Sequence, residues 1–340
     1  MTREERMKLI GNIEKLTGSR LIVIVLGDRR GLETRMAADV LPFCLEHLTA
    51  FGQPKKISLF LYSTGGITMS GYALANLLRE FCESYSVIVP FKALSCATLI
   101  TLGADNIIMT RMGQLSPIDP SIVSPLGPTA SIPGAPIQQV RTVPVNVEDV
   151  INYIELARKD LGIKDEELLT RLYDRMSQNV HPLVLGSVYR SREQIGFLAQ
   201  MLLERHMKDG EKIKKIIEIL TRGRFSHDYL IGRKEAKEIL QLPIVKVSKE
   251  IDSAIVDLYN QYDDLLQLSV PYHPEQILKG EVKNTCSLDR AIVETRDLTH
   301  VFRSRREVSR TEVRPPMVPE LQPAYMERDL GERWEMDNSI

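Results

Sequence analysis

Four short runs rich in Val, Ile and Leu, separated by segments of helical character, constrain the fold more than any other feature of the sequence. Each run has the length of a strand and is too short to cross a membrane. Strands that alternate with helices and are apolar throughout are typical of a parallel sheet covered on both faces. The sequence therefore predicts an α/β fold. The expected strands are Arg20–Leu26, Lys56–Ser63, Ser86–Phe91 and Asn106–Thr110.

Two of these strands end in residues suited to catalysis. Ser95 lies in FKALSCATLITLGADNIIM (Phe91–Met109), at a sharp turn from strand to helix, where unpaired amides stabilise negative charge. Leu59–Gly66 (LFLYSTGG) ends in Gly65 and Gly66, which allow backbone N–H groups to approach a substrate closely. Because ligands bind at the carboxyl ends of parallel strands, we expect a nucleophilic serine with an oxyanion hole. The alternative is that Ser95 only caps a helix and the glycines only form a tight turn.

Charge and cysteine content argue against several classes of protein. The net charge of −1 over 340 residues gives no basic excess, so nucleic-acid binding is not expected. The four cysteines are widely spaced and form no CxxC pair, which favours buried thiols in a reducing compartment over disulfides or a zinc site. Cys96 is a rival nucleophile to its neighbour Ser95. We expect no cofactor and no metal.

The amino-terminal segment is charged and amphipathic, and it lacks the apolar core and small-residue cleavage site of a signal peptide. No run of the sequence approaches the length of a membrane span. These features predict a cytoplasmic protein without a membrane span.

Several motifs occur together in a characteristic order: STGG (Ser63–Gly66), ALSCATLITLGADNIIM (Ala93–Met109), LSPIDPS (Leu115–Ser121) and HDYLIGRKEA (His227–Ala236). With these motifs, residues 20–247 resemble the Clp-protease/crotonase superfamily, and within it the serine dehydrogenase proteinase (SDH-type) family. The resemblance implies stacked ββα units with a mainly parallel sheet. It also implies that Ser95 is the nucleophile, that Gly65 and Gly66 lie at the first oxyanion position, and that the Cys96 N–H is the second donor.

The sequence departs from the superfamily pattern at the general base. In the Clp protease proteolytic subunit, a catalytic histidine follows the serine by about two dozen residues, a place held here by Ile118, Asp119 and Pro120. Signal peptide peptidases of the superfamily instead use a lysine further on, and the corresponding RTVPVNVED (Arg141–Asp149) contains none. The dyad and the triad of these relatives are therefore both incomplete here.

A rearranged triad is the hypothesis that we draw from this departure. Asp228 precedes Ala236 by a spacing that resembles the third catalytic residue of Clp-type peptidases, and His227 stands directly before it. We expect His227 to act as the general base of Ser95, oriented by Asp119 or Asp228, because roles in a triad are defined by geometry rather than by chain order. His181 is the rival base. The alternatives are that Asp119, His227 and Asp228 serve turns and caps, and that His181 packs at a helix start.

The expected organisation has three parts. Residues 1–19 form an amino-terminal helix, residues 20–247 a Clp/crotonase-like serine protease domain, and residues 248–340 a carboxyl-terminal helix and an extended arm or tail. The protease domain contains a proline-rich flap at 123–146 and a helical insert at 147–221. In the last part, Ser287–Thr295 and Thr299–Ser304 are expected to form a hairpin, and Pro315–Ile340 a charged tail or a partner-binding arm.

The resulting functional hypothesis is an intracellular serine peptidase, a hydrolase that acts on peptides or unfolded proteins. The first alternative is a catalytically inactive scaffold that has lost its base, and the second is a crotonase-type acyl-CoA enzyme. The resemblance implies a homo-oligomer, as a trimer, hexamer or larger ring. Because the sequence contains no GxxxxGK[ST] motif, any ATP-driven unfolding would need a separate regulatory partner.

Overall fold

The computed structural model describes residues 2–118, 121–131, 140–222, 229–313 and 322–337. The chain divides into two compact units, each described by itself below. The first unit comprises Met1–Leu115 and Ile231–Ile340, and the second comprises Ser116–Leu230.

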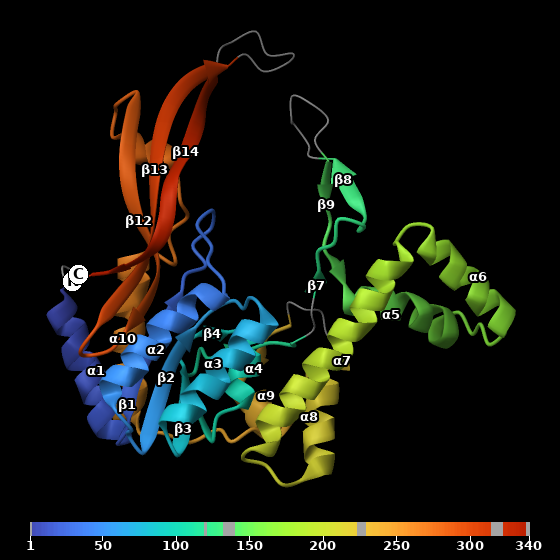
Figure 1. Ribbon diagram of the computed structural model, residues 1–340, viewed down its shortest axis with the longest axis horizontal. Helices are drawn as coiled ribbons and strands as arrows, with labels where there is room; N and C mark the ends of the chain where they lie inside the picture. Colours follow the sequence, from blue (N-terminus) through green and yellow to red (C-terminus); the bar gives the residue numbers. More distant parts are fainter. Residues whose placement is uncertain (1, 119–120, 132–139, 223–228, 314–321, 338–340) are drawn as a thin grey trace. The chain divides into compact units, whose positions relative to one another are not determined.

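A mixed sheet forms the centre of the first unit. Across the described residues its strands follow the order β14-β13-β12-β1-β2-β3-β5 (Figure 1). The strands are β1 (Arg20–Leu26), β2 (Lys56–Tyr62), β3 (Ser84–Val89), β5 (Asn106–Met109), β12 (Lys283–Glu294), β13 (Thr299–Val313) and β14 (Gln322–Met336). β1, β2, β3 and β5 are parallel to one another, and β12, β13 and β14 are added to β1 in antiparallel pairing. The predicted α/β class and its parallel strands are confirmed.

Helices cover both faces of the parallel strands (Figure 1). The helices of this unit are α1 (Arg3–Thr17), η1 (Ala38–Val40), α2 (Leu41–Phe51), α3 (Thr68–Phe81), α4 (Cys96–Leu102), α9 (Arg233–Glu238), α10 (Lys249–Leu266) and α11 (Pro274–Leu278). On one face, apolar residues of α1 and α10, among them Ile10 and Leu258, form a single buried cluster with alternate residues of β1 and β2. The intervening strand residues are buried as well, which is why these strands are apolar throughout.

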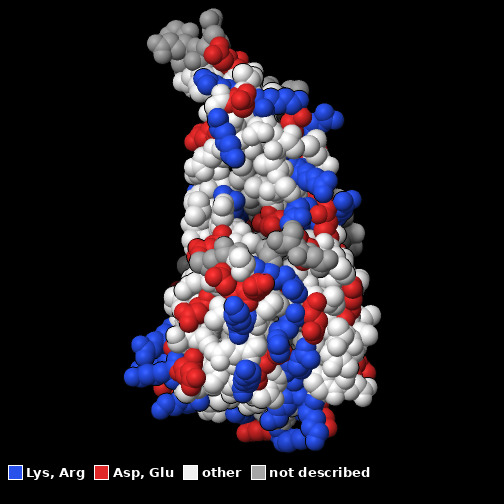
Figure 2. Space-filling model, turned by 90° about the vertical axis from the view of Figure 1, so that its left-hand side faces the viewer, with Lys and Arg blue, Asp and Glu red and all other residues white. Residues whose placement is uncertain are grey.

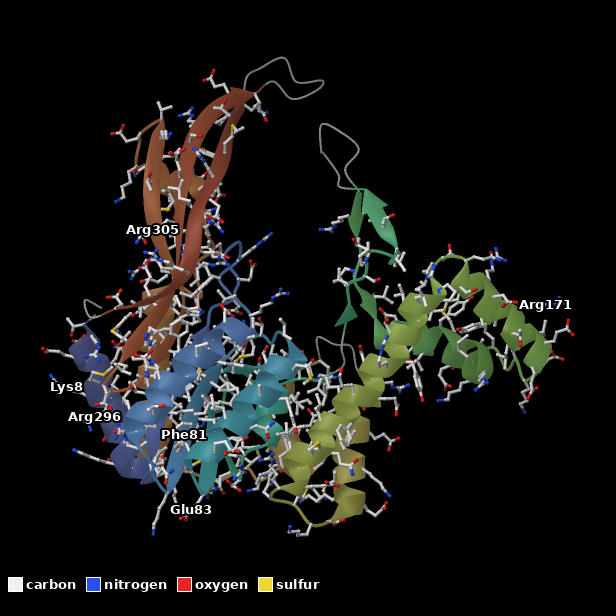
Figure 3. The ribbon with its side chains drawn as sticks, viewed as in Figure 1. Lys8, Phe81, Glu83, Arg171, Arg296 and Arg305 are labelled. Carbon is white, nitrogen blue, oxygen red and sulfur yellow. The ribbon has the colours of Figure 1, made fainter. Side chains whose placement is uncertain are left out.

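The carboxyl-terminal strands correct one expectation. The predicted hairpin is present, since β12 and β13 pair along most of their length. The expected tail is wrong for residues 322–336, because these residues form β14 and pair with β13. β14 shows no apolar pattern since nearly all of its residues are exposed, and charged pairs such as Arg306–Glu327, 2.9 Å apart, join it to β13. Arg305, labelled in Figure 3, lies on this part of β13, and charges of both signs are interspersed over the face shown in Figure 2.

The second unit consists of short strands and an array of helices. Its elements are β7 (Ser121–Ile122), β8 (Thr129–Ser131), β9 (Val140–Thr142), β10 (Val145–Asn146), α5 (Val147–Glu155), the π-helix η2 (Leu156–Asp160), α6 (Glu166–Ser177), α7 (Pro182–Glu204) and α8 (Gly210–Arg222). The helices fall where the sequence predicts the helical insert, and α7 begins with a proline as expected. Across the parts of the chain that the structure describes, no helix combines the length and the apolar character needed to cross a membrane.

A buried ion pair joins the amino terminus of the chain to its last strands. The Arg6 guanidinium donates to both carboxylate oxygens of Glu294, each at 2.8 Å, and both side chains are almost fully buried. Tyr262 of α10 and Thr299 of β13 donate to the same carboxylate at 2.5 and 2.9 Å. The buried charge of Glu294 is thus paired and fully hydrogen-bonded, which is the condition for burying a carboxylate.

Arg6→Ala is predicted to lower the free energy of unfolding by about 3–5 kcal/mol, because it leaves the Glu294 carboxylate buried without its cation. Arg171→Ala is the matched control. Arg171 pairs with Glu167 on the exposed surface of α6 (Figure 3), and such pairs contribute at most about 1 kcal/mol. Urea denaturation of both variants measures the difference. Equal losses in the two variants would contradict the role assigned to the buried pair.

Two buried imidazoles join α2 to β13. His47 Nε2 lies 3.0 Å from His300 Nδ1, and His47 Nδ1 lies 3.0 Å from the Thr295 hydroxyl. Burial, followed by the neighbouring His300, lowers the pKa of His47 to about 3. Burial also lowers the pKa of His300, although Glu46, 3.5 Å from its Nε2, acts in the opposite direction.

Stability is predicted to fall as the pH drops from about 6.5 towards about 3. In this window the unfolded chain binds protons at these histidines while the folded chain keeps His47 neutral, so the unfolded state is favoured. His47→Gln, which cannot take up a proton, is expected to reduce the slope by up to about 1.4 kcal/mol per pH unit. Urea denaturation across this pH range measures the slope. An unchanged slope in the variant would show that His47 is not the titrating group.

Candidate functional site

The ends of two strands meet where the sequence places the candidate site. β4 (Lys92–Ala93) lies beside the end of β2, and Ser63 forms a parallel bridge with Ala93. The Ser63 N–H donates to the carbonyl of Lys92 at 2.9 Å, and the Leu94 N–H donates to the carbonyl of Ser63 at 3.0 Å. β4 in turn pairs with β6 (Gln114–Leu115), which pairs with β11 (Ile231–Gly232). This small sheet fixes the turn that contains Ser95.

Ser95 has a strained backbone. Its φ of 51° and ψ of −115° lie in a region that residues with a Cβ rarely adopt. The turn is held by two hydrogen bonds, from Ala97 N–H to the carbonyl of Leu94 at 2.9 Å and from Leu99 N–H to the carbonyl of Ser95 at 3.0 Å. Among the described amides of α4, none donates a capping hydrogen bond to the Ser95 hydroxyl. A serine in a sharp strand-to-helix turn is the arrangement that exposes a nucleophilic hydroxyl in α/β hydrolases.

Gly65 and Gly66 leave room for this turn. A Cβ on Gly65, whose φ is +119°, would lie 2.9 Å from the Ser95 Cβ and 3.3 Å from its Oγ. A Cβ on Gly66, whose φ is +148°, would lie 2.2 Å from the carbonyl oxygen of Met36. Met36 pairs with this segment, since its N–H donates to the carbonyl of Gly65 at 2.8 Å and its carbonyl accepts from Ile67 N–H at 2.7 Å. Both positions therefore require glycine.

The amides at the site differ in their availability. The Gly65 N–H donates to the Ser63 hydroxyl at 3.0 Å, so it is already engaged. Within the described part of the chain, the N–H groups of Gly66 and Cys96 donate to no other group. Cys96 is the first residue of α4, where the helix leaves its amides unpaired and carries partial positive charge. These two amides are the best candidates for holding an oxyanion.

The Cys96 thiol is a packing group. It is buried, and its Sγ lies 3.3 Å from the carbonyl oxygen of Ile67, to which it donates. Burial raises its pKa to about 12, so it stays protonated at neutral pH and lacks the thiolate that a nucleophile needs. All four cysteines are free thiols, and Cys44 is as deeply buried as Cys96.

The expected base and its orienting groups remain predictions. Asp119, His227 and Asp228 lie outside the described residues. His181 belongs to the second unit, where it is exposed and caps α7, its Nδ1 accepting from Leu183 N–H at 3.2 Å. This contact fits the simpler of the two interpretations of His181, a residue that stabilises a helix start.

A polar network that the sequence alone did not single out lies at the same edge of the sheet. Lys92 Nζ is 2.6 Å from Asp28 Oδ2, and the Tyr62 hydroxyl donates to Asp28 Oδ1 at 2.6 Å. Burial, followed by the bond to Asp28, raises the pKa of the Tyr62 hydroxyl. Asp28 follows β1, Tyr62 ends β2 and Lys92 begins β4, so the network holds β4 and its turn against the parallel strands. The sequence signal that could have identified these three residues is that each lies at or next to the end of a strand.

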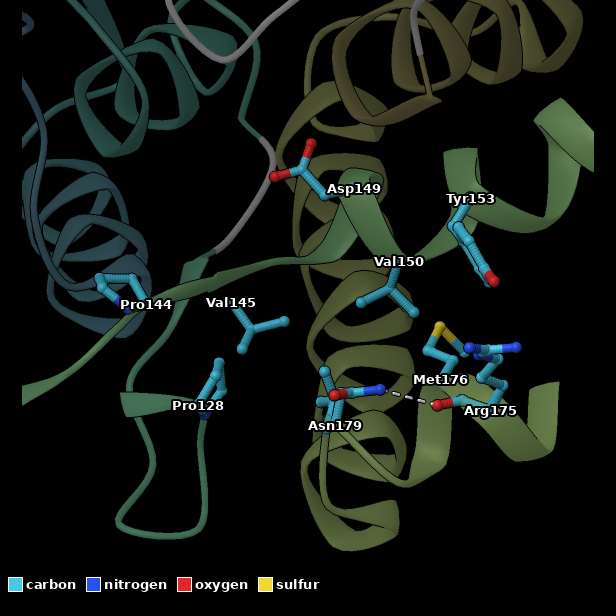
Figure 4. A pocket seen from close by; sticks show the side chains of 10 residues that line it. Pro128, Pro144, Val145, Asp149, Val150, Tyr153, Arg175, Met176 and Asn179 are labelled. Atoms are coloured by element: carbon cyan, nitrogen blue, oxygen red, sulfur yellow. Dashed lines mark hydrogen bonds between the residues drawn. The ribbon is translucent and has the colours of Figure 1, made fainter. Parts of the chain in front are cut away.

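The described residues provide no evident metal site, since no three His, Cys, Asp or Glu side chains among them are grouped to hold an ion. The second unit contains a cavity of about 450 Å³ between the segment around Pro144, helices α5 and α6, and the residues that follow α6 (Figure 4). Val145, Val150 and Met176 line it with apolar surface. The Asn179 amide is fixed beside it by a 2.9 Å hydrogen bond to the carbonyl of Arg175.

The mostly parallel sheet with its covering helices is consistent with a ClpP-like fold. Residues 44–181, which include Gly65, Gly66 and Ser95, match the family model of the ClpP-like SDH-type serine proteinases. The resemblance expected from the motifs is thereby confirmed for this segment, and the matched family is one of serine proteinases.

Two relatives come from Methanocaldococcus jannaschii. The uncharacterized protein MJ1495 is 24% identical over 287 residues, which are 82% of this chain and 84% of the relative. The uncharacterized protein MJ0137 is 26% identical over 217 residues, which are 64% of this chain and 63% of the relative, so the match spans less than two thirds of that protein. Neither name states an activity.

Gly65→Ala is predicted to destabilise the protein because the new methyl group would press on the Ser95 Cβ. Gly18→Ala is the matched control, since Gly18 also has a positive φ, of 63°, but has open space around it. The control should lose about 1–2 kcal/mol from backbone strain. Gly65→Ala should lose at least about 1 kcal/mol more from overpacking. Denaturation curves measure both, and equal losses would contradict the close approach of Gly65 to Ser95.

Proposed function

We propose that this protein is a serine peptidase in which Ser95 Oγ attacks the carbonyl carbon of a peptide bond. The observation that carries the proposal is the strained Ser95 turn next to the available amides of Gly66 and Cys96. As the new C–O bond forms, the carbonyl oxygen becomes an oxyanion, and preorganised N–H donors stabilise it more strongly than they stabilise the ground state. The family match of this segment supports the same chemistry.

The proton of Ser95 needs an acceptor. The proposed base is His227, with Asp119 or Asp228 holding its imidazole in the reactive tautomer, and His181 is the rival. The protonated base would then give its proton to the leaving amine. In the second stage the base would take a proton from water, the water would attack the acyl carbon, and Ser95 Oγ would leave and regain its proton from the base. Peptides and unfolded proteins are the proposed substrates, since extended chains can present backbone carbonyls to the amides.

A second candidate is a scaffold that keeps the fold without catalysis. It is favoured by one observation, that Ile118, Asp119 and Pro120 replace the expected histidine. For both candidates we propose a cytoplasmic homo-oligomer, as a trimer, hexamer or larger ring, with a possible regulatory partner. Only the peptidase requires a reactive Ser95, so reactivity of this residue separates the two.

A fluorophosphonate probe is predicted to label Ser95 in the folded protein, and Ser95→Ala should abolish the labelled peptide in mass spectrometry. His227→Ala should slow labelling by at least about tenfold, since a general base contributes roughly 10²–10⁴-fold. Cys96→Ala should keep labelling, because the role proposed for this residue is in its backbone amide rather than its thiol.

The variant His181→Ala decides which histidine is the base. Labelling that is lost in His181→Ala but retained in His227→Ala would move the role of base to His181. No label on Ser95, in protein shown by circular dichroism to be folded, would contradict the peptidase and support the scaffold.

A further inference from the structure

A cavity of about 430 Å³ lies in the first unit, where the loop before α2 meets the carboxyl-terminal strands. It is lined by Leu26, Glu33, Thr34, Arg35, Ala37, Asp39, Val40, Thr64, Arg290, Ala291, Phe302, Glu332 and Trp334. Its volume is within the range typical of ligand sites, roughly 300–1,000 Å³. No part of the proposed catalytic chemistry uses it.

The cavity is close to the candidate oxyanion amides. Thr64 lines it and stands two residues before Gly66, a distance of at most about 8 Å along the backbone. Arg35 lines it as well and directly precedes Met36, which pairs with Gly65 and Ile67. The cavity and the candidate oxyanion amide of Gly66 are therefore built on the same two chain segments, residues 35–36 and 64–66.

One part of the inner surface is apolar and aromatic. Leu26, Val40 and Ala291 are buried, and the rings of Phe302 and Trp334 lie 5.5 Å apart between centroids. The Trp334 indole N–H donates to Asp39 Oδ2 at 2.9 Å, which fixes a carboxylate beside the aromatic ring. Apolar walls with an aromatic face and a carboxylate suit a long side chain that ends in a cation.

The charges of the lining groups leave an excess of negative charge. Arg290 is engaged by Glu332, by the carbonyls of Leu32 and Glu33, and by the Phe302 ring, over which its guanidinium lies at 5.6 Å. Of the other lining charges, Glu33 and Asp39 form no ion pair with any described residue, and they face a single further cation, Arg35. Glu33, Arg35 and Asp39 are all exposed, and Asp39 is the one of the three that the indole N–H holds in place.

We propose that this cavity binds a lysine or arginine side chain of the peptide substrate, and this inference rests on the proposed peptidase function. Asp39 and Glu33 pair with the cation, the Trp334 ring lies against it, and the apolar floor receives its methylene groups. The cavity then supplies the selectivity that backbone amides alone cannot, since amides recognise any peptide carbonyl.

The test uses the chain's single tryptophan, which lines the cavity. Full-length Ser95→Ala protein is titrated with three peptides that differ at one position, which is Lys, Met or Glu, while Trp334 fluorescence and calorimetry are recorded. We expect saturable binding of the Lys peptide with a fluorescence change, and at least tenfold weaker binding of the Met and Glu peptides. Equal affinity for all three would overturn the proposal.

Variants of the lining groups give opposite expectations. Asp39→Asn keeps an acceptor for the indole but removes the charge, so it should weaken binding of the Lys peptide about tenfold. Arg35→Gln removes a competing cation, so it should strengthen binding of the Lys peptide. The control is Glu83→Gln, which removes an exposed carboxylate before β3, at the opposite end of the parallel strands (Figure 3). It should leave the affinity for all three peptides unchanged. The opposite result would be tighter binding of the Glu peptide than of the Lys peptide, with the Glu peptide no longer bound by Arg35→Gln. That result would assign the cavity to anionic side chains instead.

The two proposals can fail separately. Probe labelling of Ser95 in wild-type protein without selective binding of the Lys peptide would overturn the cavity assignment alone. Selective binding without any labelling would contradict the peptidase, and the cavity would then be a binding site for basic peptides on a non-catalytic protein.

Discussion

The parallel bridge between Ser63 and Ala93 is the contact on which the candidate site depends. It brings the loop after β2 against the turn before α4, so that Gly65 lies directly beside Ser95 with no space for another methyl group. Because φ at Ser95 is 51°, the turn carries a strain that isolated chain would not keep, and the surrounding bridge must maintain it. The geometry of the serine is thus a property of two strand ends together, and neither strand would produce it alone.

Two polar networks support this contact from different distances. The nearer network connects the first residue of β4, Lys92, to Asp28 and Tyr62 at the ends of β1 and β2. Lys92 precedes Ser95 by three residues. Arg6 and Glu294 act further away, where they join α1 to β12 and so hold the antiparallel strands against β1. Both networks place a charge in a buried or half-buried position, where loss of one partner costs more than the intact pair contributes.

Local features of the sequence predicted the parallel half of the sheet, the glycine pair and the serine turn, because each is encoded by adjacent residues. The base at Ser95 could not be identified in this way, since the histidine of the superfamily pattern is absent and a base is defined by its position in space. β14 was mistaken for a tail because its exposed residues lack an apolar pattern and its stability comes from cross-strand charges. The Arg6–Glu294 pair joins residues 288 positions apart, and no local pattern reports such a contact.

The two halves of the sheet contribute different kinds of recognition to the proposed peptidase. In that proposal the parallel strands would supply backbone groups, the Gly66 and Cys96 amides, which can act on any peptide carbonyl and so carry no sequence preference. The antiparallel strands add side chains at the same end of β1, since Arg290, Phe302 and Trp334 come from β12, β13 and β14. Because Arg290 is already engaged by Glu332 and Trp334 fixes Asp39, the side chains that remain to meet a substrate are mainly acidic and aromatic. Selectivity for basic side chains would then arise from two parts of the first unit together, the acidic residues Glu33 and Asp39 of the segment before α2 and the aromatic rings of β13 and β14.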